Sequence, residues 1–204
     1  MNVEACLSWL SADPPNIDRA KEAARIAIED GKDAGKVIQK VRALFRKSEP
    51  SKEPMDIHLA IGEVIRLMRD ELTRNRTSVE VSGDEQIPLV YADRLQIQQV
   101  MWNLIHNAAE AMEGLESNRV IKVNIQWNRS SEVSVSVSDR GLGFPALDRA
   151  FEAFFTTKKS GMGMGLTICK TIIEAHGGHL QVKPSSDIGT TLSFTVPTRP
   201  QSSQ

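Results

Sequence analysis

Polar side chains recur on one face of a predicted helix in the middle of the chain. Asn103, Asn107 and Glu110 stand four and three residues apart, so their side chains project from the same helical face. Asparagine has a poor propensity for helix interiors, and its amide oxygen is a neutral ligand that magnesium accepts beside waters and phosphate oxygens. The spacing predicts a ligand site, with hydrogen bonds from both asparagines to neighbouring loops as the alternative.

A second group of candidate residues follows a predicted strand of alternating valines. The strand ends in the sequence Asp139-Arg140-Gly141-Leu142-Gly143. Its carboxylate can accept a hydrogen bond from an exocyclic amine such as that of adenine, and glycines let a base lie against the main chain. An ordinary turn with a capping aspartate is the alternative.

A third group is a glycine-rich run that leads into a predicted helix. The run follows the segment 151–158, which reads FEAFFTTK and ends in Lys158. Its glycines are Gly161, Gly163 and Gly165, and the helix begins at Leu166. Glycines before a helix start let backbone amides point at an anion, which the helix dipole also favours. We therefore expect a lid over phosphate groups, with a surface loop beside a core aromatic cluster as the alternative.

Two formal motif matches are excluded by their context. Gly141, Gly143 and Ala146 match a dinucleotide fingerprint, but a glycine-rich segment follows where a second parallel strand with an acidic end is required. The segment 31–37 is one residue too short for a phosphate-binding P-loop, and no serine or threonine follows its lysine.

Bulk composition bounds the class of protein. The chain has 204 residues, 40% of them hydrophobic and 25% charged, which suits one well-packed domain with a helical addition. A formal charge of -1 argues against nucleic acid as the main partner. Cys6 and Cys169 suggest neither a disulfide framework nor a metal pair, and there is no apolar run for a signal peptide or a membrane span. We expect a cytoplasmic location.

The elements that position these residues predict a two-layer α/β (α+β) sandwich, with helices on one face of a mixed sheet. Hydrophobic periodicity predicts helices at 57–75, 94–116 (capped by Asp93) and 166–176, and strands at 77–81, 89–91, 120–127, 133–137, 180–182 and 192–196.

A helical hairpin is predicted before this sandwich. Small and apolar residues follow a heptad pattern from Ile17 to Phe45, and Asn16 is a candidate N-cap after a shorter helix over 3–10. A single amphipathic helix is the alternative. The predicted boundaries are a hairpin over 1–47, a linker over 48–56, a domain over 57–199 and a tail over 200–204.

In order, the three groups and Gly189-Thr190-Thr191 closely resemble the N, G1, F, G2 and GT boxes of sensor histidine kinases of two-component systems. The resemblance covers roughly residues 57–197 and implies the Bergerat ATP-binding fold, with ATP and Mg2+ as cofactors. By this similarity the metal ligand would be Asn107 and the adenine-reading carboxylate Asp139. The other implied nucleotide contacts are Asn103, Gly141, Gly143, Lys158, Gly161, Gly163, Gly165, Leu166 and Thr191, the last acting through a water.

The hairpin resembles the family's dimerisation and phosphoacceptor domain, but the chain departs from that pattern. The family's phosphoacceptor histidine lies in the first helix, and this chain has no histidine before His58. His106 lies within the N box but points about a hundred degrees away from the magnesium position, which favours a structural role. We therefore assign no catalytic residue and expect no autophosphorylation in cis, as in a shortened relative or a chain cut within that helix.

The resemblance implies a catalytic module that donates the γ-phosphoryl group of ATP to a histidine outside the chain. Its partners would be a response regulator through the parent kinase and, as an open alternative, a second copy through the N-terminal helices. A nucleotide-binding interaction module that pairs with an intact kinase is the second interpretation. A third, a stand-alone ATPase, is disfavoured because Asn103 stands where such an enzyme carries a glutamate base.

Overall fold

The computed structural model describes residues 2–28, 31, 51–116, 119–129, 131–143, 147–156, 163–184 and 189–199. The chain divides into two compact units, Met1–Lys47 and Ser48–Gln204, and each is treated by itself. Among the described residues, no helix combines the length and the apolar character needed to cross a membrane.

The first unit holds helix α1, Asn2–Leu10, and a second helix over 17–28. The side chain of Asn16 accepts a hydrogen bond from the amide of Arg19 at 3.1 Å, which confirms the predicted N-cap. The Arg19 guanidinium lies 4.6 Å from the centre of the Trp9 ring and so joins the two helices. Ala20 and Ala23 are buried. The heptad positions from 32 to 45 lie outside the described residues.

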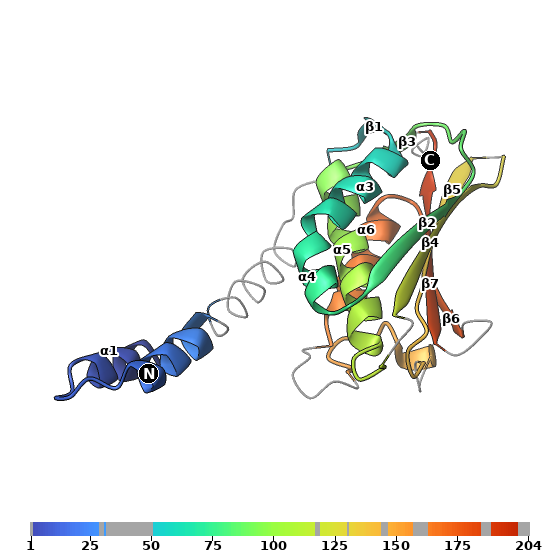
Figure 1. Ribbon diagram of the computed structural model, residues 1–204. Coiled ribbons are helices and arrows are strands. Elements are labelled where there is room, and N and C mark those ends of the chain that lie inside the picture. The colour runs from blue at the N-terminus through green and yellow to red at the C-terminus, as the bar shows by residue number, and fades with distance from the viewer. Residues whose placement is uncertain are drawn as a thin grey trace. The chain divides into compact units, whose positions relative to one another are not determined.

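The second unit is built on a five-stranded mixed sheet in the order β2-β4-β5-β7-β6. Its strands are β2 (Ser78–Gly83), β4 (Val120–Trp127), β5 (Glu132–Ser138), β6 (Leu180–Pro184) and β7 (Thr190–Pro197). The edge strand β2 runs parallel to β4, and all other pairs are antiparallel. Figure 1 shows the helices on one face of this sheet.

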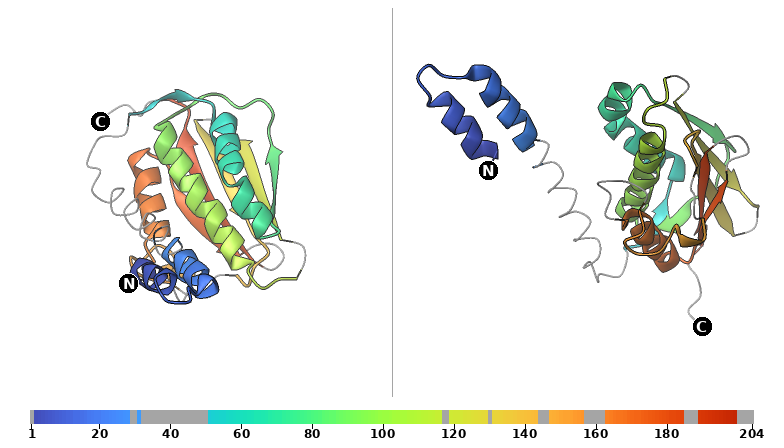
Figure 2. Two further views of the ribbon diagram at one scale, coloured as in Figure 1. Left: turned by 60° about the vertical axis from the view of Figure 1, so that its left-hand side comes forward. Right: turned by 90° about the horizontal axis from the view of Figure 1, so that it is seen from below.

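Those helices are α3 (Ile57–Leu67), α4 (Arg69–Arg74), α5 (Arg94–Ala111) and α6 (Gly165–Ala175). Figure 2 shows α5 lying between α3 and α6 across the sheet. The core fills the space between the two layers, because alternate residues of β4, β5 and β7 turn toward the helices and are buried. The predicted two-layer arrangement is therefore confirmed.

The structure corrects two helix boundaries. The predicted helix over 57–75 is interrupted at Met68, which is fully buried and separates α3 from α4. The central helix is capped by Asp93, whose Oδ1 accepts from the Gln96 amide at 3.1 Å, as predicted. It ends at Ala111 rather than near residue 116, because a turn with Gly114 at φ 87° follows.

A two-stranded sheet precedes the central helix. Its strands are β1 (Glu53–Met55) and β3 (Val90–Ala92), which pair antiparallel with Glu53 opposite Ala92. The linker predicted over 48–56 therefore contains a strand. This strand belongs to the second unit, which begins at Ser48.

The second face of the five-stranded sheet is polar. Ser134 and Ser136 of β5 lie opposite Thr195 and Ser193 of β7, and all four are half-buried. Among the described residues no helix covers this face (Figure 1). Strand β2, at the edge, is mostly exposed, with Glu80 at its centre.

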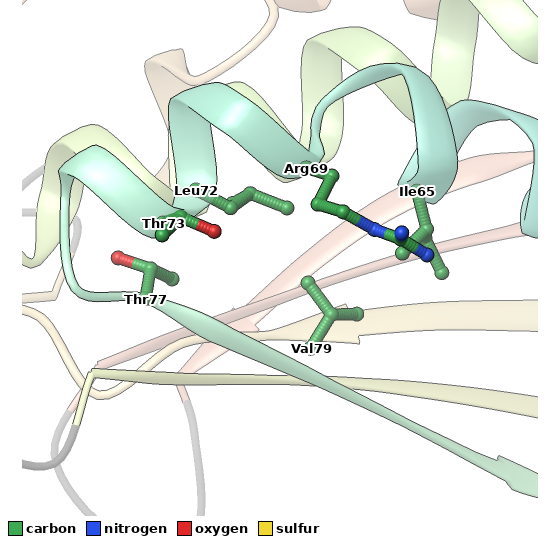
Figure 3. Close-up of a pocket in the computed structure, with 6 residues that line it drawn as sticks. All are labelled: Ile65, Arg69, Leu72, Thr73, Thr77 and Val79. Atoms are coloured by element: carbon green, nitrogen blue, oxygen red, sulfur yellow. The ribbon is translucent and has the colours of Figure 1, made fainter.

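An open pocket lies between the helical layer and this edge (Figure 3). Its lining residues are Ile65, Arg69, Leu72, Thr73, Thr77 and Val79. None of these is a predicted nucleotide contact. The predicted contacts Asp139 and Thr191 lie elsewhere, at the end of β5 and the start of β7.

Candidate nucleotide-binding site

Asp139 lies just after β5 and is buried, with 5% of its surface exposed. Its Oδ1 accepts hydrogen bonds from the backbone amides of Gly141 at 2.8 Å and Thr190 at 3.2 Å. Burial raises the pKa of Asp139, and these two amides partly oppose the shift. Among the described residues no donor reaches Oδ2. The carboxylate is therefore fixed through one oxygen, while the other has no donor among the described residues.

The loop after Asp139 packs directly on the end of helix α5. A Cβ atom at Gly141 would lie 2.3 Å from the carbonyl oxygen of Ala111, so only glycine permits this approach. Ala111 follows Asn107 by one helical turn. The predicted adenine contact and the predicted metal ligand are thus brought to the same end of α5. Asn107 is half-buried there.

The GT segment corrects one predicted residue. Leu192 and Phe194 of β7 are buried and alternate with residues on the polar face. Thr190 stands two residues before Leu192, so its side chain lies on the same buried face. Thr191 points to the opposite face, where its hydroxyl lies 2.8 Å from that of Ser138. Thr190, not Thr191, therefore shares the face of Asp139. Sequence reasoning missed Thr190, although the alternation of apolar residues along the strand could have identified it.

Asn103 lies two turns from the end of α5 and faces the start of α6. Its side chain lies near the thiol of the buried Cys169, and its Oδ1 lies 3.9 Å from the Cβ position of Gly165. Burial raises the pKa of Cys169 to about 12, so the thiol stays neutral at physiological pH. Asn103 and Gly165, both predicted site residues, are therefore neighbours.

The two flanks of the glycine-rich run meet. The amide of Phe154 donates to the carbonyl oxygen of Gly163 at 3.1 Å, and a Cβ at Gly163 would lie 2.5 Å from the backbone of Phe154. Phe154 has φ 66° and is 74% exposed, an uncommon state for a bulky residue. Lys158 and Gly161 lie outside the described residues. Gly143, at the G1 loop, has its Cβ position 3.6 Å from the carbonyl oxygen of Gly189.

Helix α6 begins at Gly165, and its N-cap residue Met164 makes no side-chain cap hydrogen bond to the amides of the first turn, which include that of Leu166. The preceding segment is held to α6 by a hydrogen bond from Thr167 Oγ1 to the Phe151 carbonyl oxygen at 3.2 Å. Lys170 lies over the Phe151 ring at 5.7 Å. This arrangement presents a positive helix end beside Asn103.

His106 connects the central helix to α4. Its Nε2 lies 3.4 Å from a carboxylate oxygen of Glu71, and its Nδ1 lies 3.3 Å from one of Glu110. Glu110, which the spacing places on the stripe of Asn103 and Asn107, thus contacts His106. These contacts are those of a residue that joins two helices.

Comparisons with known proteins define the class to which this site belongs. Residues 92–200 match the sequence model of the family described as histidine kinase-, DNA gyrase B- and HSP90-like ATPases. The chain belongs to this family, and its second unit is the ATP-binding domain of a sensor histidine kinase with the Bergerat fold.

Individual relatives support the same class. The chain is 33% identical over 201 residues to the sensor histidine kinase TmoS of Ectopseudomonas mendocina, covering 96% of this chain and 21% of TmoS. It is 35% identical over 185 residues to the sensor protein FixL of Bradyrhizobium diazoefficiens, covering 90% of this chain and 36% of FixL. The chain therefore spans well under half of either relative.

A solved structure shares the fold. The catalytic domain of the histidine kinase ThkA superposes with a TM-score of 0.64 at 30% sequence identity, covering 72% of this chain and 96% of that domain. The resemblance inferred from the motifs is confirmed.

Proposed function

We propose that this chain binds Mg-ATP and donates the γ-phosphoryl group to a histidine beyond its 204 residues. The observation that carries the proposal is the geometry of Asp139. Two backbone amides hold Oδ1, and no described residue donates to Oδ2. A carboxylate oxygen held in this way is suited to accept a hydrogen bond from the exocyclic amine of adenine. Thr190, on the same face, would add a water-mediated contact.

The phosphate end of the nucleotide would lie between α5 and the start of α6. The uncapped amides of the first turn of α6 suit phosphate oxygens, and the run from Gly161 to Gly165 with Lys158 would cover them. No group of three or more His, Cys, Asp or Glu side chains within the described part of the chain is placed to hold a metal alone. Asn107 would therefore hold magnesium together with phosphate oxygens and waters. The metal would neutralise charge on the transferred group.

Phosphoryl transfer is favoured over ATP hydrolysis by the environment of Asn103. This amide occupies the position of a glutamate base. The nearby Cys169 thiol has a pKa of about 12, so it is not ionised at neutral pH and cannot act as a base. The chain would then position ATP for attack by a histidine instead of activating water.

The first unit offers a surface for a partner. Val3 and Leu7 of α1 are 62% and 60% exposed, and Ile28 of the next helix is 59% exposed. Apolar side chains on short helices favour association with further helices. We include in the proposal a homodimer through these helices, a response regulator as the partner of the parent kinase, and a cytoplasmic location. The alternative of a pairing module without catalysis rests on the same surface.

Calorimetric titration with a non-hydrolysable ATP analogue, with and without magnesium, tests the site. We expect magnesium-dependent binding by the wild-type chain, loss of binding in Asp139→Asn and altered magnesium dependence in Asn107→Asp. Gln99→Ala, on the same helix, is the matched control and should bind normally. A GTP analogue should bind at least about tenfold more weakly, because guanine presents a carbonyl oxygen to Asp139. Failure of the folded wild-type chain to bind would refute the proposal.

Incubation with labelled ATP tests the transfer. The chain alone should form no phosphohistidine, whereas a dimerisation domain that carries the phosphoacceptor histidine should become labelled when this chain is added. Absence of label with a binding-competent chain would favour the interaction module.

A further inference from the structure

Helices α5 and α6 are joined at both of their ends. Near the candidate site, Asn103 contacts Cys169 and lies beside Gly165, the first residue of α6. At the far end, the C-cap of α6, His176, meets the N-cap of α5, Asp93. The two helices therefore run antiparallel, and the far junction lies about 21 Å along α5 from Asn107.

The far junction depends on a neutral histidine. His176 is 1% exposed, and its Nε2 lies 2.9 Å from the backbone nitrogen of Asp93. Because the Asp93 amide can only donate, Nε2 must carry a lone pair. The proton then resides on Nδ1, which donates to the Ile172 carbonyl oxygen at 2.7 Å. A second proton on the ring would place two donors against each other.

The surroundings of the His176 ring favour its neutral state overall. Burial, the largest effect, lowers the pKa of His176, and the positive charge of Lys52 lowers it further. The hydrogen bond to the Ile172 carbonyl and the Asp93 carboxylate oppose these effects. The Asp93 carboxylate is itself engaged, because Oδ1 caps α5 and Oδ2 accepts from the Ser51 amide at 3.1 Å.

Three segments of the chain therefore meet at the contact between His176 and Asp93. Ser51 belongs to the segment that leads into β1, and β1 pairs with β3, which ends directly before Asp93. His176 adds the end of α6 to this point. Helices α5 and α6 both run from this point to the predicted site residues at their opposite ends.

We propose that His176 is a positioning residue for nucleotide binding, locking α6 to the cap of α5 so that Asn107 and the first turn of α6 keep the spacing that the phosphates require. This role rests on the proposed binding of Mg-ATP. Protonation of the ring releases the lock, so affinity falls in acid. Gln is the informative replacement, because its Oε1 can accept from the Asp93 amide without titrating.

The test is a titration of Mg-bound adenylyl imidodiphosphate from pH 8 to pH 5.5 into wild type, His176→Gln and His176→Ala. The ratio of wild-type to His176→Gln dissociation constants cancels the titration of the nucleotide itself. We expect a ratio within about twofold of one at pH 8, which rises once the pH falls far enough for the buried ring to take up a proton. Because the charge of Lys52 lowers the pKa of His176, Lys52→Met should shift the pH at which affinity falls to a higher value. His176→Ala should bind more weakly throughout, and His176→Gln keeps the test decisive should that variant not fold.

Amide hydrogen exchange supplies a readout without nucleotide. The protection factor of the Asp93 amide should fall in acid in the wild-type chain and stay constant in His176→Gln, with the Gln96 amide as internal control. Nucleotide affinity in a folded His176→Ala within twofold of the wild-type value at pH 8 overturns the positioning role alone. No nucleotide binding by either folded protein at pH 8 overturns the proposed function and this role together.

Discussion

The backbone amide of Thr190 donates a hydrogen bond to Oδ1 of Asp139 at 3.2 Å, which fixes the start of β7 to the end of β5. The hydroxyl of Thr190 lies on the buried face, and that of Thr191 pairs with Ser138 on the polar face. Two adjacent threonines therefore have separable roles, which substitutions can distinguish.

Thr190→Val should weaken binding of an ATP analogue about fivefold to tenfold, because valine removes the hydroxyl and keeps the shape. Thr191→Val is the matched control and should change affinity less than twofold. Calorimetric titration of both variants measures the difference. Equal losses in the two variants would contradict the assignment of Thr190.

Asp139→Asn should separate stability from binding. Burial raises the pKa of Asp139 in the folded protein above the ordinary value of 3.8. The folded state therefore favours the neutral carboxyl group: its contribution to stability is full below pH 3.8 and is lost as the pH rises through the folded pKa. The amide avoids this loss and still accepts from both backbone amides, so at pH 7 the variant should melt at or above the wild-type temperature while binding no nucleotide. Thermal unfolding at pH 4 should show a smaller difference. A large drop in melting temperature at pH 7 would contradict the argument.

Gly141→Ala should destabilise the domain by about 1–3 kcal/mol and abolish nucleotide binding, because the new Cβ meets the Ala111 carbonyl oxygen. Gly62→Ala is the matched control. No heavy atom lies within 4 Å of its Cβ position in α3, so alanine should stabilise the helix by about 0.5–1 kcal/mol. Denaturant unfolding measures both. Equal changes in the free energy of unfolding for Gly141→Ala and Gly62→Ala would contradict the close approach of the Gly141 loop to Ala111.

Glu63→Gln should remove a pH-dependent contribution to stability. Glu63 on α3 accepts from Arg94 on α5 at 2.6 Å, and this hydrogen bond, with the Arg94 charge, lowers the pKa of Glu63 below 4.5. A carboxyl group whose pKa is lowered on folding stabilises the folded state at any pH above its unfolded-state pKa. This stabilisation is lost as the pH falls through its folded-state pKa. The wild-type chain should melt higher than Glu63→Gln at pH 7, and the difference should shrink as the pH falls below 4.5 and Glu63 takes up a proton. Glu113→Gln, exposed after α5, should show no such difference.

Much of the fold follows from local patterns. Alternating valines predicted β5 closely, and Asp93 was identified as a cap because an acidic side chain precedes an apolar helical repeat. The interruption at Met68 could not be predicted, since no glycine or proline marks it and Met68 is an apolar residue that fits the helical pattern. The strand β1 was missed because a short polar segment with prolines has no periodicity, and its pairing with β3 is a tertiary contact.

The candidate site shows the same division. The order of its motifs identified Asn103 and Asp139, since their residue types and spacing carry the chemistry. Which threonine faces Asp139 depends on the phase of β7, and the motif that pointed to Thr191 does not carry that phase. The role of His176 depends on a hydrogen bond across 83 positions of the sequence, which no local pattern predicts.

The exposed edge strand β2 has a consequence for solubility. Its residues Ser78-Val79-Glu80-Val81-Ser82 read the same in both directions, so two copies could align their edges antiparallel with Glu80 facing Glu80. Like charges opposed across a strand pair are unfavourable, and a charge at mid-edge is a common guard against such pairing. Glu80 therefore disfavours pairing of this edge with a second copy, and replacing it by a neutral residue would weaken that protection.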